Sequence, residues 1–461
     1  MTASPTAEKT LPFGDGLVSV DGEDLDGKPF SRYLDRCQVD TPHSLVKLTW
    51  DEVLKRRTEI GLVLDFGSGD CRFARHGRYD RYIGYEIDPT RQSKIPLPTD
   101  AEIEIGCAFA SNRSDADLCI GNPPFVRNQD LPDGWRNRMA SLLREKTGIQ
   151  LSGYANAWQY FMLLAIASCR EDGLCALVVP YEWISRPSVK TLRDYIRSMG
   201  WTVAVTRLED QMFNGVLTTA SVTIIDKRGK SGLWSVSGCS ENEKPTESMP
   251  EVLAYTKREY NHVGPRATRG LSPGHQRALV LTETERLSAN LDVNKDVVPA
   301  VTTLRTLPRQ CRNLTPTIFR ENFIEAGLRC WLIRTDIQPS TSLETYLNSV
   351  DSAYRNTVTC QAREIWWKFA FPQTPQVLSS QSFRAPAPKT VLNSVGAKAV
   401  GGTCAVHGLT QKQARFLVNY IGDMNLEDRI VAHSNGLLKV EINQFNTLMD
   451  EVLSTFPSRS A

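Results

Sequence analysis

The feature that most constrains the fold of this chain is a regular alternation of short apolar runs and helical patterns between residues 41 and 226. The apolar runs have the length of strands, and amphipathic patterns of helical length lie at 154–168 and 188–199. Strands that alternate with helices predict a mainly parallel sheet with helices on both faces, which is a doubly wound α/β domain. The seven expected strands are 62–66, 82–87, 101–105, 118–121, 174–179, 202–208 and 222–226.

The rest of the chain has a different composition. Residues 237–250 are rich in Ser, Glu, Asn and Pro, and residues 262–273 are rich in Gly and Pro, which indicates loops or linkers. From residue 304 the pattern is less regular, with helices expected near 410–419 and 441–453. We therefore expect an N-terminal tail at 1–40, the α/β domain at 41–230, a connecting region at 231–303 and a second, mixed domain at 304–461.

The overall charge excludes little. The 461 residues carry 54 basic and 52 acidic side chains, so the net charge of +2 neither indicates nor excludes a basic nucleic-acid cleft. No apolar run approaches the roughly 20 residues that span a membrane, and the N-terminus lacks the features of a signal peptide. The 11 cysteines show no zinc-ligand spacing. We expect a cytoplasmic protein with reduced thiols, no bound metal and no membrane contact.

The turn after the first expected strand contains Gly67 and Gly69, with Asp65 just before it. A strand that ends in Gly-x-Gly and leads into a helix brings backbone N–H groups close to a ligand. A dinucleotide fingerprint needs a third glycine where this chain has Arg72, so a pyrophosphate-bearing cofactor is disfavoured. Taken alone, the turn is equally consistent with a tight structural bend.

The second expected strand ends in Glu86, followed by Ile87 and Asp88. An acidic residue about 20 residues after the glycine turn is placed to accept hydrogen bonds from a ribose diol. Asp88 precedes Pro89 and fits a loop-turning role better. A glycine turn with a ribose acid, but without the third glycine, predicts a nucleoside cofactor, and S-adenosylmethionine is the leading candidate.

The motif that carries the most chemical information, Asn122-Pro123-Pro124-Phe125, follows the fourth strand, at the sheet edge where open α/β sheets bind ligands. The two prolines stiffen the backbone and remove its N–H donors. The side-chain oxygen of Asn122 and the carbonyl of Pro123 are two acceptors that match the two N–H donors of a planar amino group. Phe125 supplies a flat face on which a base can stack. A rigid loop without a ligand is the alternative.

With these motifs in this order, the sequence resembles the amino-methylating DNA methyltransferases of the arrangement called gamma. In that arrangement the cofactor motifs come first, the catalytic motif next and the target recognition domain last. The resemblance implies a Rossmann-like seven-stranded methyltransferase domain followed by a mixed recognition domain. It also implies that S-adenosylmethionine is the methyl donor and that the N6 amino group of adenine is the acceptor.

The resemblance implies roles for individual positions. The catalytic motif is Asn122, Pro123, Pro124 and Phe125, and Phe213 is a second aromatic that contacts a flipped-out base. Thr41, before Pro42, matches a leading motif that closes over the cofactor. We expect cofactor contacts at Thr41, Asp65, Gly67, Gly69, Glu86, Ile87, Phe109 and Asn122.

The sequence departs from the family pattern after the third strand. The family often has an acidic residue there that holds the cofactor adenine, but the stretch 105–109 contains no carboxylate. In its place, we expect Phe109 to stack on the cofactor adenine. Asp115 and Asp117 are alternative carboxylates, although Asp117 fits the opening of the fourth strand better.

The resemblance makes double-stranded DNA the expected partner, with phosphate contacts in the second domain. Trp366 and Trp367 fit the core of that domain better than a wedge into DNA. Candidate phosphate ligands are Arg305, Arg309, Arg312, Arg363, Lys368, Arg384 and Lys389.

The expected function is that of a bacterial or archaeal site-specific adenine DNA methyltransferase, the modification part of a restriction-modification system. Any restriction endonuclease is expected as a separate chain. The alternatives are methylation of the cytosine amino group in DNA, of an RNA base, or of a protein glutamine amide, because those enzymes also use an Asn-Pro-Pro-aromatic motif. A DNA-binding protein on a degenerate fold is disfavoured by the intact motif at Asn122 and the intact glycine turn.

Overall fold

The computed structural model describes residues 39–91, 95–132, 134–208, 219–238, 262–430, 432–434 and 437–457. The chain divides into two compact units, each with its own core. The first unit comprises Met1–Pro250 with Ala432–Gly436, and the second comprises Glu251–Val431 with Leu437–Ala461. Within the described ranges no helix is both long enough and apolar enough to cross a membrane.

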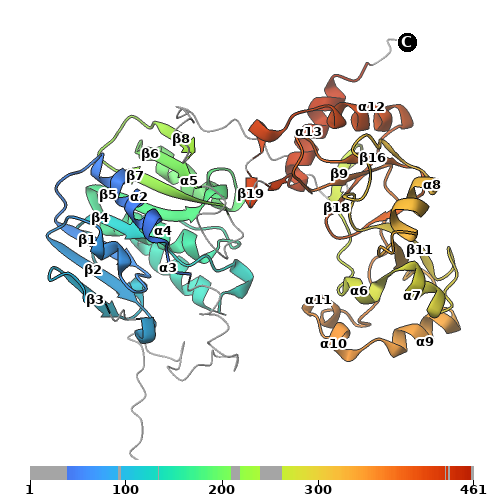
Figure 1. The fold of residues 1–461 in the computed structure, drawn as a ribbon, viewed down its shortest axis with the longest axis horizontal. Coiled ribbons are helices and arrows are strands. Elements are labelled where there is room, and N and C mark those ends of the chain that lie inside the picture. The colour runs from blue at the N-terminus through green and yellow to red at the C-terminus, as the bar shows by residue number, and fades with distance from the viewer. Residues whose placement is uncertain are drawn as a thin grey trace, which may run out of the picture. The chain divides into compact units, whose positions relative to one another are not determined.

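The first unit is built on an eight-stranded sheet with the order β3-β2-β1-β4-β5-β7-β6-β8 (Figure 1). All neighbours in the sheet are parallel except β7, which runs antiparallel to both β5 and β6. The predicted mainly parallel sheet is therefore confirmed. Its strands are β1 (Leu62–Phe66), β2 (Arg81–Glu86), β3 (Ala101–Ile105), β4 (Ala116–Gly121), β5 (Cys169–Pro180), β6 (Thr202–Arg207), β7 (Ala220–Asp226) and β8 (Trp234–Gly238).

Strand β8 lies beyond the seven strands expected from the sequence, inside the expected connecting region. Trp234 and Val236 face the core, and the Trp234 ring packs 5.5 Å from that of Trp183. The inward and outward alternation spans only five residues and is followed by a polar, Ser-rich stretch, so composition alone pointed to a loop.

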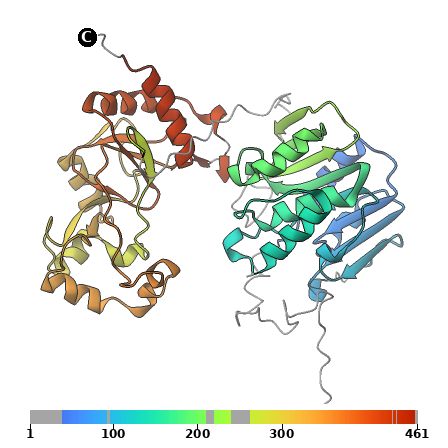
Figure 2. The ribbon, with the colours of Figure 1, turned by 180° about the vertical axis from the view of Figure 1, so that it is seen from behind.

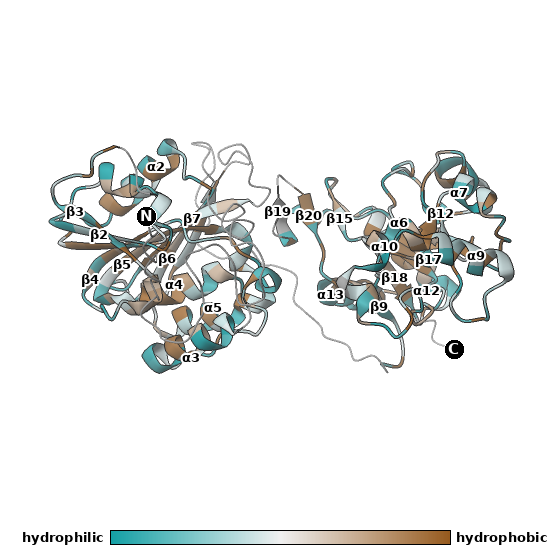
Figure 3. Ribbon diagram, turned by 90° about the horizontal axis from the view of Figure 1, so that it is seen from below, coloured by the Kyte–Doolittle hydropathy of each residue, from teal (hydrophilic) through white to brown (hydrophobic). Residues whose placement is uncertain are grey.

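Helices cover both faces of this sheet, as expected. Figure 3 shows α2 (His43–Leu54) on one side and α3 (Trp135–Thr147), α4 (Ala157–Ser168) and α5 (Lys190–Ser198) on the other, and Figure 2 views the latter side from the front. Helix α4 is apolar nearly all round because it is enclosed by β1, β4 and β5 beneath it and by α3 beside it. Short helical turns join these elements: η1 (Arg72–Arg75), η2 (Pro89–Arg91), η3 (Ala108–Ala110), η4 (Asn128–Asp130), η5 (Tyr181–Ile184) and η6 (Pro187–Val189).

The strands of the sheet are apolar because their side chains are buried in a core beneath α2. Leu118 and Ile120 of β4 are buried against the α2 side, in one cluster with Leu45 and Trp50. The indole N–H of Trp50 donates to the Phe73 carbonyl at 2.8 Å, which joins α2 to η1. Since β4 is buried along its whole length, the motif that follows it leaves the sheet from a fixed point.

The second unit contains smaller sheets of short strands. A four-stranded sheet has the order β10 (Val280–Leu281), β13 (Trp331–Ile333), β11 (Val297–Val301) and β17 (Lys398–Ala399). A five-stranded sheet has the order β12 (Asn313–Leu314), β16 (Thr390–Asn393), β14 (Val377–Ser380), β18 (Thr403–His407) and β9 (Arg266–Arg269). Strand β15 (Ser382–Phe383) pairs with β20 (Leu437–Lys439). Strand β19 (Ala432–Ser434) belongs to the first unit.

Two longer helices of the second unit confirm the helices expected near 410–419 and 441–453. Helix α12 (Gln411–Gly422) begins at a capping box formed by Thr410 and Gln413, and α13 (Ile442–Ser454) packs against it. The shorter ones are α6 (Gln276–Leu279), α7 (Glu283–Ser288), α8 (Pro316–Phe319), η7 (Arg320–Ile324), α9 (Thr341–Ser349), α10 (Ser352–Arg355), α11 (Val358–Gln361) and η8 (Glu427–Arg429).

The stretch expected as a connecting region, 231–303, contributes to the second unit wherever it is described beyond residue 261. Its strands β9, β10 and β11 all pair with later strands of that unit. Trp366 and Trp367, expected in the core, are partly buried against the second unit's core. The second unit therefore begins well before residue 304.

Candidate active site

Sheet order brings the three sequence motifs to one edge. Strand β1 lies between β2 and β4, and all three run parallel. The glycine turn after β1, Glu86 at the end of β2 and Asn122 directly after β4 therefore leave the sheet side by side. This is the edge at which open α/β sheets bind ligands.

The glycine turn passes close to the prolines of the catalytic motif. Gly67 has φ of 85°, a conformation that favours glycine, and a Cβ built there would lie 3.7 Å from Cδ of Pro124. The N–H groups of Gly67 and Ser68 both donate to the Tyr85 carbonyl at 2.9 Å. The turn after β1 is thus held to the end of β2 and lies against the motif after β4.

Glu86 is 8% exposed and is oriented by two backbone groups. Its Oε2 accepts from the Gly69 N–H at 2.8 Å, and its Oε1 accepts from the Asp88 N–H at 2.9 Å. Because a carboxylate offers about four lone-pair sites, both oxygens keep capacity for a further donor. Asp88 itself accepts from the backbone and side chain of Thr90, which is the turning role expected for it.

Asp65 lies beneath the glycine turn and is fully buried. The Tyr82 hydroxyl donates to its Oδ2, whereas its Oδ1 has no hydrogen-bond partner within the described part of the chain. Burial raises the pKa of the Asp65 carboxyl to about 7, the Tyr82 bond opposes this rise, and the nearby Glu86 and Asp70 carboxylates add to it. With a pKa of about 7, the buried Asp65 carboxyl is partly protonated near neutral pH.

The carboxamide of Asn122 presents a free acceptor. Its Nδ2 donates to the Thr41 hydroxyl at 3.1 Å, while its Oδ1 is buried and accepts no hydrogen bond from any described residue. Pro123 is buried and supplies a carbonyl without an N–H. Phe125 is partly exposed and packs against the core beneath α2. The arrangement can receive a group that donates two hydrogen bonds and has a flat face.

The chain that follows the motif is tied to the start of α4. Asn156 Oδ1 accepts from the Asn128 N–H at 2.9 Å, and the Ala157 N–H donates to the Val126 carbonyl at 2.9 Å. These bonds limit the movement of residues on the far side of Phe125, so the aromatic ring leaves the motif in a defined direction.

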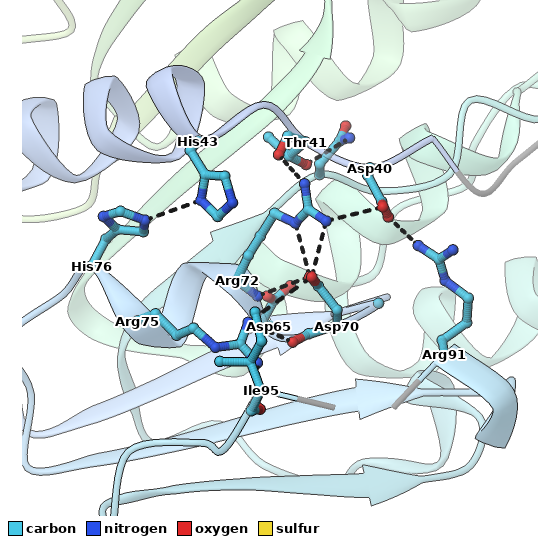
Figure 4. Close-up of polar contacts among 12 residues, drawn as sticks. Asp40, Thr41, His43, Asp65, Asp70, Arg72, Arg75, His76, Arg91 and Ile95 are labelled. Atoms are coloured by element: carbon cyan, nitrogen blue, oxygen red, sulfur yellow. Dashed lines mark hydrogen bonds and ion pairs between the residues drawn. The ribbon is translucent and has the colours of Figure 1, made fainter. Parts of the chain in front are cut away.

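A strap formed by Asp40, Thr41 and Pro42 crosses to the motif from the start of α2, as Figure 4 shows for its ion pairs. Arg72 pairs with Asp70 at 2.8 Å and with Asp40 at 3.0 Å, and it donates to the Thr41 carbonyl at 2.5 Å. Arg91 pairs with Asp40 from the other side. The strap is therefore attached to both the glycine turn and the segment after β2.

Three other expected site positions lie as follows. Ile87 is 38% exposed next to Glu86. Phe109 is 1% exposed, and its ring meets those of Phe161 and Trp135 edge-on at 4.9 and 5.6 Å, so a cofactor adenine would reach it only after these rings shift. Phe213 lies outside the described residues.

Asp115 and Asp117, the alternative carboxylates for holding the cofactor adenine, lie at the end of the sheet opposite Asn122. Asp117 stands at the start of β4, where it accepts from the Leu62 N–H at 2.8 Å and pairs with Arg170 at 2.6 Å. Asp115 is exposed and pairs with Arg113. Asp117 thus opens the fourth strand, as expected, and neither carboxylate lies at the edge that carries Asn122.

Sequence reasoning missed Tyr82, Asp40 and Asp70, which hold Asp65 and the strap in place. The available signals were weak: Asp40 directly precedes Thr41, and Arg72 stands where a dinucleotide fingerprint has glycine. From the sequence, Arg72 indicates only that a dinucleotide cofactor is disfavoured. Its several N–H donors can also bind carboxylates and carbonyls, which is the role that the sequence did not reveal.

Residues 86–210 match the family model described as the Eco57I restriction-modification methylase. The matched range begins at Glu86 and includes the whole motif at Asn122. A stretch of 158 residues is 25% identical to the Type II methyltransferase M.AccI of Acinetobacter calcoaceticus. It covers 32% of this chain and 28% of that protein, so the similarity spans less than a third of either sequence.

Two solved structures share the fold over most of this chain. The Type IIL restriction-modification enzyme MmeI, solved in complex with DNA, is 12% identical, with a TM-score of 0.52 over 87% of this chain and 65% of that one. A nuclease-deletion mutant of the Type ISP restriction-modification enzyme LlaGI, solved with a DNA substrate mimic, is 10% identical, with a TM-score of 0.50 over 85% and 52%. Across the strands and turns that carry Glu86 and Asn122, the chain is thus similar to Eco57I-type restriction-modification methyltransferases.

Proposed function

We propose that this chain is the site-specific DNA methyltransferase of a restriction-modification system, and that it methylates the N6 amino group of a flipped-out adenine in double-stranded DNA. The observation that carries the proposal is the buried Oδ1 of Asn122, which has no hydrogen-bond partner among the described residues and directly follows a central strand. Leaving a buried acceptor unpaired costs stability, and at this edge of the sheet a ligand that donates to Oδ1 would remove that cost.

The chemistry of an adenine amino group fits this site. Its nitrogen is a poor nucleophile because the lone pair is delocalised into the ring. The Asn122 Oδ1 and the Pro123 carbonyl would hold both N–H bonds and orient the lone pair toward the methyl donor, while Phe125 stacks on the base. Catalysis would then come from positioning and from fixed dipoles, with no side chain required to remove a proton before attack.

S-adenosylmethionine, when bound, supplies an electrophilic methyl group on sulfur. The residues at the sheet edge fit this cofactor: Glu86 keeps lone pairs for two ribose hydroxyls, and Gly67 and Gly69 bring backbone close to the ligand. Ile87 offers an exposed apolar side chain beside Glu86. Thr41, Asp65 and Phe109 complete the set of cofactor contacts that we propose, and the contact with Phe109 requires the rings of Phe161 and Trp135 to shift.

DNA is the partner that the second unit's surface supports. The loop 304–312 exposes Arg305 and Arg309, and neither side chain has a partner among the residues described. Lys389 donates to the carbonyls of Leu307 and Arg305, and Arg312 donates to the Arg309 carbonyl at 3.0 Å. A loop whose carbonyls are held by these two cations, and which presents two unpaired arginines, suits a phosphate backbone.

Several of the expected phosphate ligands already have partners within the second unit. Lys389 and Arg312 are committed to the loop's own carbonyls, and Arg363 donates to the Pro273 carbonyl at 2.6 Å. Among the expected phosphate ligands, Arg305, Arg309 and the exposed Lys368 are those whose side chains contact no partner in the described ranges. We therefore propose the first unit as the catalytic domain and the second as the target recognition domain.

An N-methyltransferase that acts on an RNA base or a protein glutamine amide is the alternative, because Asn122 and Pro123 would hold any planar amino group. Single-molecule sequencing of DNA from cells that express the chain separates these possibilities. We expect N6-methyladenine in one fixed short sequence, absent from cells that express Asn122→Ala. Unmodified DNA, together with labelled RNA or protein in the same cells, would overturn the proposal.

A further inference from the structure

We infer that Thr41 is a positioning residue for Asn122: its hydroxyl holds the plane of the carboxamide so that Oδ1 faces the amino group to be methylated. The inference rests on the proposed function and adds a role to a residue expected to contact only the cofactor. It follows from one hydrogen bond, between Thr41 Oγ1 and Asn122 Nδ2, across a sequence separation of 81 residues.

This bond is the only side-chain hydrogen bond that Asn122 makes with a described residue. The terminal torsion of an asparagine is broad, so the carboxamide plane is set by its partners rather than by an intrinsic preference. Pro123 follows directly and fixes only the backbone. Without the Thr41 hydroxyl, the plane of the catalytic amide would have no partner to define it.

Orientation of the amide decides whether the site attracts or repels an amino group. With Nδ2 bonded to Thr41, the group left facing the site is the acceptor Oδ1. A carboxamide rotated by half a turn would present N–H donors to a donor. The threonine hydroxyl holds the plane, and the amino group itself then selects the orientation that offers it an acceptor.

Contacts on both sides of Thr41 hold its part of the strap in place. Thr41 is 5% exposed, and its carbonyl accepts from Arg72 at 2.5 Å. The next carbonyl, that of Pro42, accepts from the N–H groups of Leu45 and Val46 in the first turn of α2, at 2.9 and 3.0 Å. Arg72 is fixed in turn by Asp70 at the end of the glycine turn. A continuous set of contacts therefore links the cofactor turn to the catalytic amide through Thr41.

The matched pair Thr41→Val and Thr41→Ser tests this role, since valine keeps the shape and serine keeps the hydroxyl. Single-turnover methylation of duplex DNA is measured with saturating S-adenosylmethionine, and calorimetric titration gives the cofactor Kd. We expect Thr41→Val to slow single turnover by roughly tenfold, the loss of one hydrogen bond, with the Kd within about twofold of wild type. Thr41→Ser should restore most of the rate.

Thr147→Val is the matched control, because it removes a hydroxyl bonded to a carbonyl at 2.7 Å in α3, away from the site, and it should leave the rate unchanged. A Thr41→Val enzyme with wild-type single-turnover rate would overturn the inference. So would a loss confined to the cofactor Kd, which would make Thr41 a cofactor contact alone. A wild-type chain that methylates no DNA would instead overturn the proposed function, and this inference with it.

Discussion

The carboxylate of Asp65 packs against Gly121 so closely that a Cβ at that position would collide with its Oδ1. Asp65 belongs to the strand that leads into the glycine turn, and Gly121 directly precedes Asn122. Gly121 also has φ of 149°, which an L side chain rarely adopts. The buried acid therefore lies against the residue that directly precedes the catalytic motif, so a change at Asp65 or at Gly121 is expected to affect both halves of the site.

Asp65→Asn should stabilise the protein at alkaline pH. The folded state raises the pKa of the Asp65 carboxyl from its usual value of 3.8 to about 7. Between these values the folded chain binds more protons than the unfolded chain, so the stability that depends on Asp65 falls as pH rises through this window and stays low above it. Asparagine is neutral throughout and still accepts from Tyr82. We expect the variant to gain a few degrees in Tm over wild type at pH 8 but not at pH 4.

Thermal unfolding of both proteins at pH 4 and pH 8 measures this gain. An identical Tm difference at the two values would contradict a titrating buried acid at position 65.

Glu86→Ala should weaken cofactor binding by one to two orders of magnitude, because hydrogen bonds to a charged group contribute roughly 1.5–3 kcal/mol. Calorimetric titration with S-adenosylmethionine measures the affinity. Glu104→Ala, which removes an exposed carboxylate from the neighbouring strand β3, is the matched control and should bind normally. Equal affinities of the Glu86 variant and wild type would remove Glu86 from the cofactor site.

Arg305→Ala and Arg309→Ala should each weaken binding to duplex DNA at all sequences. Each lost phosphate contact should reduce the slope of log Kd against log salt by about 1. Arg320→Ala is the control, because Arg320 is an exposed arginine of the same unit that is already paired with Glu325 at 3.4 Å. Fluorescence anisotropy at several salt concentrations gives the slopes, and unchanged slopes would place the DNA on another surface.

The sheet of the first unit could be predicted because most of its strands are apolar runs that are buried, and helical patterns lie between them. The expected strands 62–66 and 101–105 have the bounds of β1 and β3, and the bounds of the other five are shifted by one or two residues, apart from the earlier start of β5. The motifs could be located for the same reason, since parallel strands carry their carboxyl-terminal turns to one edge. The second unit could not be predicted in this way, because strands such as β10 and β12 have two residues and show no period.

The partners of the site residues lay beyond sequence reasoning. The bonds from Arg72 to Asp40 and Thr41 join residues about 30 positions apart, and no periodicity relates them. Lys389 and Arg312 looked like phosphate ligands because composition records charge but not where each donor is used. Only packing shows that these two cations brace a loop and leave the exposed arginines beside them unpaired.

We propose that Asn122 holds the N6 amino group of adenine in DNA while the methyl group passes from S-adenosylmethionine to its nitrogen. Purified wild type and Asn122→Ala are incubated with duplex DNA and isotope-labelled S-adenosylmethionine, and the digested nucleosides are identified by mass spectrometry. We predict labelled N6-methyladenine with wild type and a loss of at least about a thousandfold with Asn122→Ala, whose cofactor affinity stays near that of wild type. Labelled N4-methylcytosine in place of N6-methyladenine, or undiminished turnover by Asn122→Ala, would contradict the claim.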